Sequence, residues 1–67
     1  MDKALLRSIM VLNGDTDKTL AAHLGISDRS FSSKINENGS EFNKREISAI
    51  IQRYNLTEEI VMRIFFS

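Results

Sequence analysis

The chain has 67 residues, with nine basic and nine acidic side chains, one histidine, no cysteine and no proline. This length suits a single domain over residues 1–67 with one small core, and the lack of cysteine excludes disulfides and thiolate metal sites. No apolar run approaches the roughly 18 residues of a membrane span, and the balanced charge does not by itself indicate a nucleic-acid partner.

The first predicted element is a helix that ends before Gly14. Leu5, Ile9 and Leu12 recur at the spacing i, i+4, i+7, so we expect them to form one buried helical face. Glycine is common directly after a helix because it adopts positive φ without strain. The sequence therefore predicts a first helix that packs through these three apolar side chains.

Residues 16–36 predict two short helices joined by a tight turn. Thr16 and Ser27 are typical N-terminal caps, and each precedes a short run with apolar residues at helical spacing. The expected helices extend from Thr16 to Leu24 and from Ser27 to about Asn36. These two helices carry most of the functional prediction.

The turn between the two helices contains only Gly25 and Ile26. A turn this short requires a residue that tolerates left-handed φ, as glycine does. Ala21 supplies a small side chain where the helices approach each other. The apolar side chains expected in the shared core are Leu20, Leu24, Ile26, Phe31 and Ile35. The simpler alternative is a generic helical hairpin.

Two further helices are predicted in the C-terminal half. Asn43 lies three residues before Glu46, which is the spacing of a capping box, and it opens an apolar stretch with helical periodicity. Thr57 opens the last helix, with Glu58 and Glu59 in the first turn, where the helix dipole favours negative charge. Because no strand pattern occurs, the expected fold class is all-α with five helices.

The run LAAHLGIS, followed by an amphipathic helix, resembles the helix-turn-helix of the lambda repressor and Cro family. The later runs FSSKIN and EISAIIQRYNLTEEIVMRIFF resemble small phage or prophage regulators of that family. The resemblance covers nearly the whole chain and implies a five-helix, lambda-repressor-like domain that binds operator DNA as a dimer. The chain departs from the family pattern at Asp15, where an apolar residue is usual. It departs again at Asp17, where a phosphate-contacting glutamine is common and an acid would repel phosphate.

The second helix of the pair presents a polar face. Phe31 and Ile35 face inward. At about 100° per residue, the side chains expected to point most nearly outward are Arg29, Ser33 and Asn36, with Ser30 and Ser32 beside them. Arginine can bind guanine bidentately, serine can donate or accept at several base edges, and aspartate can accept from a cytosine amine. We predict base contacts from Asp28, Arg29, Ser32 and Ser33, and phosphate contacts, which position the protein without reading sequence, from Lys34, Asn36, Asn43 and Lys44.

The last helix is too apolar for one buried stripe. Met62 and Phe66 fall outside the stripe formed by Ile60, Val61, Ile64 and Phe65. Exposed apolar side chains of this kind indicate an interface, and we predict a homodimer contact through Met62 and Phe66. The alternative is that Phe66 folds back over the core. A two-fold dimer would present two recognition helices about 34 Å apart to a palindromic operator.

The predicted function is sequence-specific DNA binding that regulates transcription, as a repressor or Cro-type protein. The alternative is a helix-turn-helix module that binds a repressor, antirepressor or toxin protein, which the neutral charge and Asp17 favour. We expect no enzyme and no cofactor, because His23 has no ligand or triad partner at a recognisable spacing and the serines have no glycine elbow. With no signal-peptide pattern, the expected location is the cytoplasm.

Overall fold

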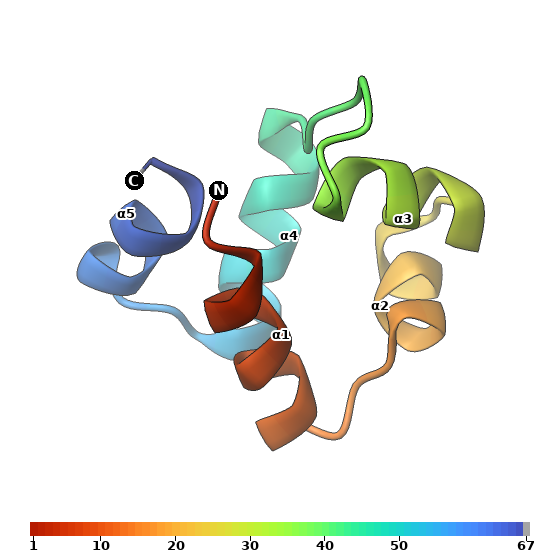
Figure 1. The fold of residues 1–67 in the computed structure, drawn as a ribbon. Coiled ribbons are helices and arrows are strands. Elements are labelled where there is room, and N and C mark those ends of the chain that lie inside the picture. The colour runs from red at the N-terminus through yellow and green to blue at the C-terminus, as the bar shows by residue number, and fades with distance from the viewer. Residues whose placement is uncertain (67) are drawn as a thin grey trace.

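The computed structural model describes residues 1–66, which contain five α-helices and no β-strand. The helices are α1 (Lys3–Leu12), α2 (Asp17–Leu24), α3 (Asp28–Ile35), α4 (Lys44–Tyr54) and α5 (Glu58–Phe65). Figure 1 shows α2 and α3 on one side of α4 and α5 on the other, with α1 in front. The prediction of an all-α fold is confirmed. None of these helices is long and apolar enough to cross a membrane.

The predicted capping residues set the starts of four helices. Each accepts a hydrogen bond from the backbone amide three residues later: Thr16 for α2, Ser27 for α3, Asn43 for α4 and Thr57 for α5. In α4 the capping box is complete, because the Glu46 carboxylate accepts from the Asn43 amide at 3.0 Å. A cap of this kind contributes about 1 kcal/mol. The predicted starts of α2 to α5 are confirmed.

One apolar core connects the five helices. Its buried side chains are Leu6, Met10, Leu20, Ala21, Leu24, Phe31, Ile35, Phe42, Ile50 and Ile64. The ring of Phe31 in α3 lies 5.7 Å from the ring of Phe42, centroid to centroid, and Phe42 packs edge-on against Phe65 of α5 at 6.5 Å. These aromatic contacts hold α3 in a defined position relative to the C-terminal helix.

The buried face of α1 differs from the predicted one. Leu6 and Met10 are buried, Leu5 and Ile9 are half-buried, and Leu12 is 84% exposed. The prediction that Leu12 faces the core is wrong. At about 100° per residue, Leu12 points roughly 140° away from the direction midway between Leu6 and Met10.

The connection between α1 and α2 carries a buried carboxylate. Asn13 caps the end of α1, Gly14 follows with φ +76, and Asp15 then enters the interior. Arg53 donates to the two oxygens of Asp15 at 2.7 and 2.8 Å, the Tyr54 hydroxyl donates at 2.5 Å, and the Thr19 hydroxyl donates at 2.8 Å. The bond from Arg53, against the opposing effect of burial, holds the pKa of Asp15 well below its usual range. Asp15 thus ties this connection to the end of α4.

Candidate nucleic-acid interface

A turn of three residues, Gly25, Ile26 and Ser27, joins α2 to α3. Gly25 has φ +73, and the Ile26 amide donates to the Ala21 carbonyl at 3.0 Å. A β-carbon on Gly25 would have no atom within 4 Å, so the left-handed φ, rather than a lack of space, favours glycine here. Ala21 is fully buried and lets the two helices approach closely. The predicted turn is therefore present.

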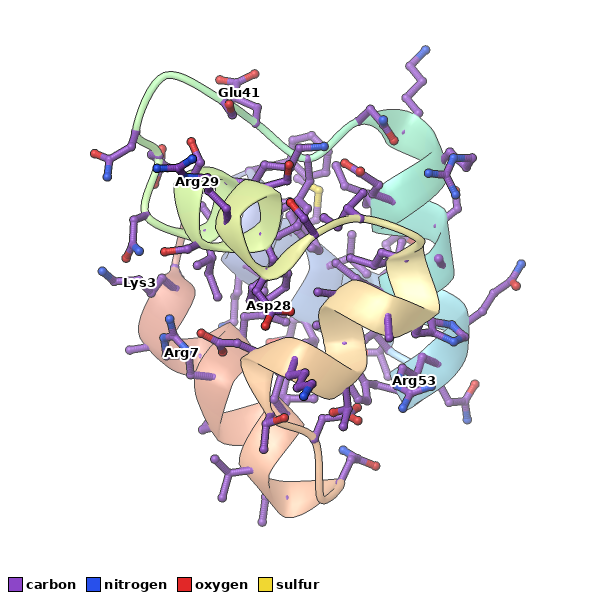
Figure 2. All side chains as sticks on the ribbon, turned by 90° about the vertical axis from the view of Figure 1, so that its right-hand side faces the viewer. Lys3, Arg7, Asp28, Arg29, Glu41 and Arg53 are labelled. Carbon is purple, nitrogen blue, oxygen red and sulfur yellow. The ribbon has the colours of Figure 1, made fainter. Side chains whose placement is uncertain are left out.

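The orientation of α3 follows from its two faces. Phe31 and Ile35 are buried in the core, as predicted. Arg29, Ser32 and Asn36 are exposed, and their spacing of i, i+3, i+7 places them on one face. Figure 2 shows Arg29 directed outward from α3. We call these three residues the polar row.

Hydrogen bonds extend the polar row to the start of α1. The Asn36 side-chain amide donates to the Ser32 hydroxyl at 3.3 Å. The Asn36 amide oxygen accepts from Lys3 Nζ at 2.9 Å. Asn36 is thus oriented from both sides, and a cation from α1 lies beside the end of α3.

An exposed ion pair marks the start of α2. Arg7 Nη1 lies 2.6 Å from Asp17 Oδ1, and the two side chains are 40% and 43% exposed. Asp17 is also the first residue of α2, where the helix dipole favours an acid. The negative charge at position 17 is therefore balanced by an arginine of the same chain.

Two of the predicted contact residues, Ser33 and Lys34, form hydrogen bonds within the chain. Ser33 is half-buried, and its hydroxyl donates to the Asn38 carbonyl at 3.1 Å and lies 3.4 Å from the Ser40 hydroxyl. Lys34 Nζ donates to both carboxylate oxygens of Glu46 at 2.7 Å. The Lys34 side chain is 18% exposed and that of Glu46 is 1% exposed. The Ser33 hydroxyl and the Lys34 ammonium, which were predicted to contact DNA, thus connect α3 to the following loop and to α4.

Glu46 has a second role that sequence reasoning missed. Burial alone would raise its pKa, but hydrogen bonds from the Lys34 ammonium and the Asn43 backbone amide outweigh burial, so the pKa of Glu46 is lowered. The capping spacing identified only the contact with Asn43. No local pattern links Lys34 to Glu46, because the two residues belong to different helices.

The remaining predicted contact residues are exposed at helix starts. Asp28 is the first residue of α3 and directly precedes Arg29. Asn43 caps α4, its side-chain oxygen accepts from the Glu46 amide at 2.8 Å, and Lys44 is the first residue of that helix. The structure therefore gathers Asp28 and the polar row on α3 and places Asn43 and Lys44 beyond the α3–α4 loop.

Met62 and Phe66, the predicted dimer residues, are 53% and 63% exposed at α5. The other apolar side chains of this helix turn inward as their spacing predicted: Ile64 is buried, and Ile60, Val61 and Phe65 are half-buried. In Figure 1, α5 lies on the side of the molecule away from α2 and α3.

The candidate interface is therefore the polar row, with Lys3 at its end and the Arg7–Asp17 pair at the start of α2. Figure 2 shows Lys3, Arg7 and Arg29 along the same side of the molecule. Within residues 1–66, no three histidine, aspartate or glutamate side chains come together in a way that could hold a metal ion. Comparisons with models of protein families, with curated proteins and with solved structures find no match to this chain.

Proposed function

We propose that the protein is a sequence-specific DNA-binding regulator of transcription, of the phage or prophage repressor or Cro type. In this proposal α2 and α3 are a lambda-repressor-like helix-turn-helix, and α3 enters the major groove. The observation that carries the proposal is the polar row, which a short helix presents to solvent while Phe31 and Ile35 anchor its opposite face in the core.

Arg29 is the main base-reading residue in this proposal. Its exposed guanidinium can donate two parallel hydrogen bonds to O6 and N7 of a guanine. Ser32 lies one turn further along and can donate or accept at a base edge, and Asp28 can accept from a cytosine amine. Ser33 and Lys34 are left out, because the fold already uses their donor groups.

Phosphate contacts come from residues that flank the helix in the groove. Asn36 ends α3, and Asn43 and Lys44 begin α4, so they lie at the two ends of one loop. Contacts from these positions would hold the register of α3 along the groove and add affinity without sequence preference.

Replacement of Arg29 by alanine tests the base-reading role. We expect the variant to lose about 1–3 kcal/mol of binding free energy at the preferred site and to relax base preference at one position. The preferred site comes from duplexes selected out of a randomised pool, and affinity is measured by fluorescence anisotropy. Arg63→Ala, an exposed arginine on α5, is the matched control and should keep the full preference. An Arg29→Ala variant with unchanged base preference would contradict the assignment.

A second copy of the chain is the proposed partner of α5. Replacement of Met62 and Phe66 by serine should convert a dimer into a monomer, because their exposed apolar surface would no longer favour association. Sedimentation equilibrium measures the mass directly. Leu12→Ser removes a similarly exposed apolar side chain from α1 and should leave the mass unchanged. A wild-type chain that stays monomeric, free and on a palindromic duplex, would refute this dimer.

One alternative has its own support. The net charge of zero and the carboxylates of Asp17 and Asp28 favour a helix-turn-helix module whose α3 face binds a repressor, antirepressor or toxin protein. Binding to mixed-sequence duplex DNA at several salt concentrations distinguishes the two functions. Each phosphate contact should add about −0.9 to the slope of log affinity against log salt. If no complex forms even at low salt, the DNA-binding proposal fails and the protein-binding module is favoured.

A further inference from the structure

We propose that Lys3 and Arg7 form a second phosphate-binding edge on α1, next to the polar row, and that Asp17 competes with DNA phosphate for Arg7. We call Lys3 and Arg7 the basic edge. The inference rests on the proposed DNA-binding function and adds to it two binding residues and one residue that limits affinity.

The first argument is position. Lys3 and Arg7 are four residues apart on α1 and therefore lie on the same helical face. Lys3 contacts Asn36 at the end of α3, and Arg7 contacts Asp17 at the start of α2. Figure 2 shows both cations on the same side as Arg29. DNA held against the polar row would bring its backbone close to this edge.

The second argument is the contrast between exposed and buried ion pairs. The acids paired with Lys34 and Arg53 are buried, at 1% and 6% exposure. Those two pairs join α4 to α3 and to the α1–α2 connection inside the fold. In the Arg7–Asp17 pair the acid is 43% exposed and the arginine 40%, and Lys3 is exposed. Exposed ion pairs contribute little to folding. Their cations can therefore change partner without loss of the fold.

The third argument is the chemistry of the two cations. A guanidinium carries five N–H donors, and the Asp17 carboxylate accepts from Nη1 of Arg7, so a phosphodiester oxygen can share the group or replace the carboxylate. An ammonium carries three donors, and Asn36 accepts one of those of Lys3. Lys3 can therefore contact phosphate while it remains bound to Asn36, whereas Asp17 occupies a donor of Arg7 that a phosphate would otherwise use.

The test is binding of the full chain to a mixed-sequence duplex across a range of salt. Lys3→Gln and Arg7→Gln should each reduce the salt slope by about one and lower the affinity roughly five- to tenfold at about 0.1 M salt. Asp17→Asn should raise the affinity by a comparable factor. Arg63→Gln, which removes the same charge from α5, should leave the slope unchanged, with sedimentation equilibrium verifying that its mass equals that of the wild type. Circular dichroism and thermal unfolding verify that each variant is folded.

A double variant isolates the role of Asp17. If Asp17 acts by occupying Arg7, then Asp17→Asn introduced together with Arg7→Gln should raise affinity less than about twofold relative to Arg7→Gln alone. An equal gain with and without Arg7 would show that Asp17 acts only by repelling phosphate, and the proposed competition would be overturned.

The outcomes also separate this inference from the proposed function. If the wild-type chain binds DNA and Arg29→Ala relaxes base preference, but Lys3→Gln and Arg7→Gln leave the salt slope unchanged, the basic edge is refuted and the α3 interface stands. If the wild-type chain forms no complex at low salt, both proposals fail.

Discussion

Replacement of Asp15 by alanine is expected to lower the free energy of unfolding by about 3 kcal/mol. The substitution leaves Arg53, Tyr54 and Thr19 without the carboxylate that accepts their hydrogen bonds. Loss of one partner from a buried ion pair typically costs about 3–5 kcal/mol, and we take the low end because the Arg53 side chain is 31% exposed. A domain of this size has roughly 3–10 kcal/mol of stability in total. Urea unfolding followed by circular dichroism and by the fluorescence of the single tyrosine, Tyr54, measures the loss.

Asp17→Ala is the matched control for this substitution. It also removes an aspartate from an arginine, but the Arg7–Asp17 pair is exposed on both sides. Exposed pairs contribute at most about 1 kcal/mol, so the loss should be clearly smaller than at Asp15. Equal losses at the two positions would mean that burial of Asp15 is not the source of its effect.

The same network predicts a dependence of stability on pH. The pKa of Asp15 is lower in the folded chain than in the unfolded one, chiefly because Arg53 donates to its carboxylate. The stabilisation is therefore fully present above the unfolded value of about 3.9, and it decreases as the pH falls below that value. Asp15→Asn should make the loss of stability between about pH 5 and pH 2 less steep than in the wild-type chain. Parallel curves for the two proteins would contradict this account.

The starts of α2 to α5 could be predicted from the sequence because capping is local. Each cap side chain accepts a hydrogen bond from the backbone amide three residues later, at Thr16, Ser27, Asn43 and Thr57. Donor and acceptor are therefore close in the chain before any tertiary contact forms. Most of the exposed face of α3 was predictable for a related reason, since Phe31 and Ile35 set the direction of the helix. Ser33, which was expected to point outward, is half-buried.

The buried charges could not be predicted, because their partners are distant in the sequence. Asp15 and Arg53 are 38 positions apart, and only the packing of α4 against the α1–α2 connection brings them together. The sequence predicts Lys34 as a free cation on a helix surface, whereas in the structure α4 places Glu46 beside it. An acid at a position expected to be apolar was the one signal in the sequence, because a buried carboxylate needs a cation or hydrogen-bond donors as partners.

The outward direction of polar residues on α3 could be predicted from the sequence, but their tertiary contacts could not. Periodicity placed the polar residues of α3 outward, but it could not tell which hydroxyl or ammonium would be used by the following loop or by α4, as Ser33 and Lys34 are. Nor could it place Lys3 beside Asn36, because that contact depends on how α1 packs against α3.

Replacement of Glu46 by alanine is expected to cost about 2–4 kcal/mol of stability. It removes the acceptor that completes the capping box with Asn43 and leaves the Lys34 ammonium, only 18% exposed, without its carboxylate. Glu46→Gln should cost less, because an amide oxygen can still accept from the Asn43 amide. Urea unfolding of the two variants measures the difference, and equal losses would show that the cap contributes nothing.

Combining Lys34→Met with Glu46→Gln then separates the cost of an unpaired charge from the value of the pair. Each single variant leaves one charge of a largely buried pair without its partner, at 18% exposure for lysine and 1% for glutamate. The double variant removes both charges and keeps the cap, so it should lie within about 1.5 kcal/mol of the wild type and be less destabilised than the sum of the two single variants. Strict additivity would mean that the two side chains do not interact.

The same double variant tests whether Lys34 contacts DNA. If Lys34 serves only the fold, the variant should bind DNA with an unchanged salt slope. A slope reduced by about one would show that Lys34 also contacts phosphate.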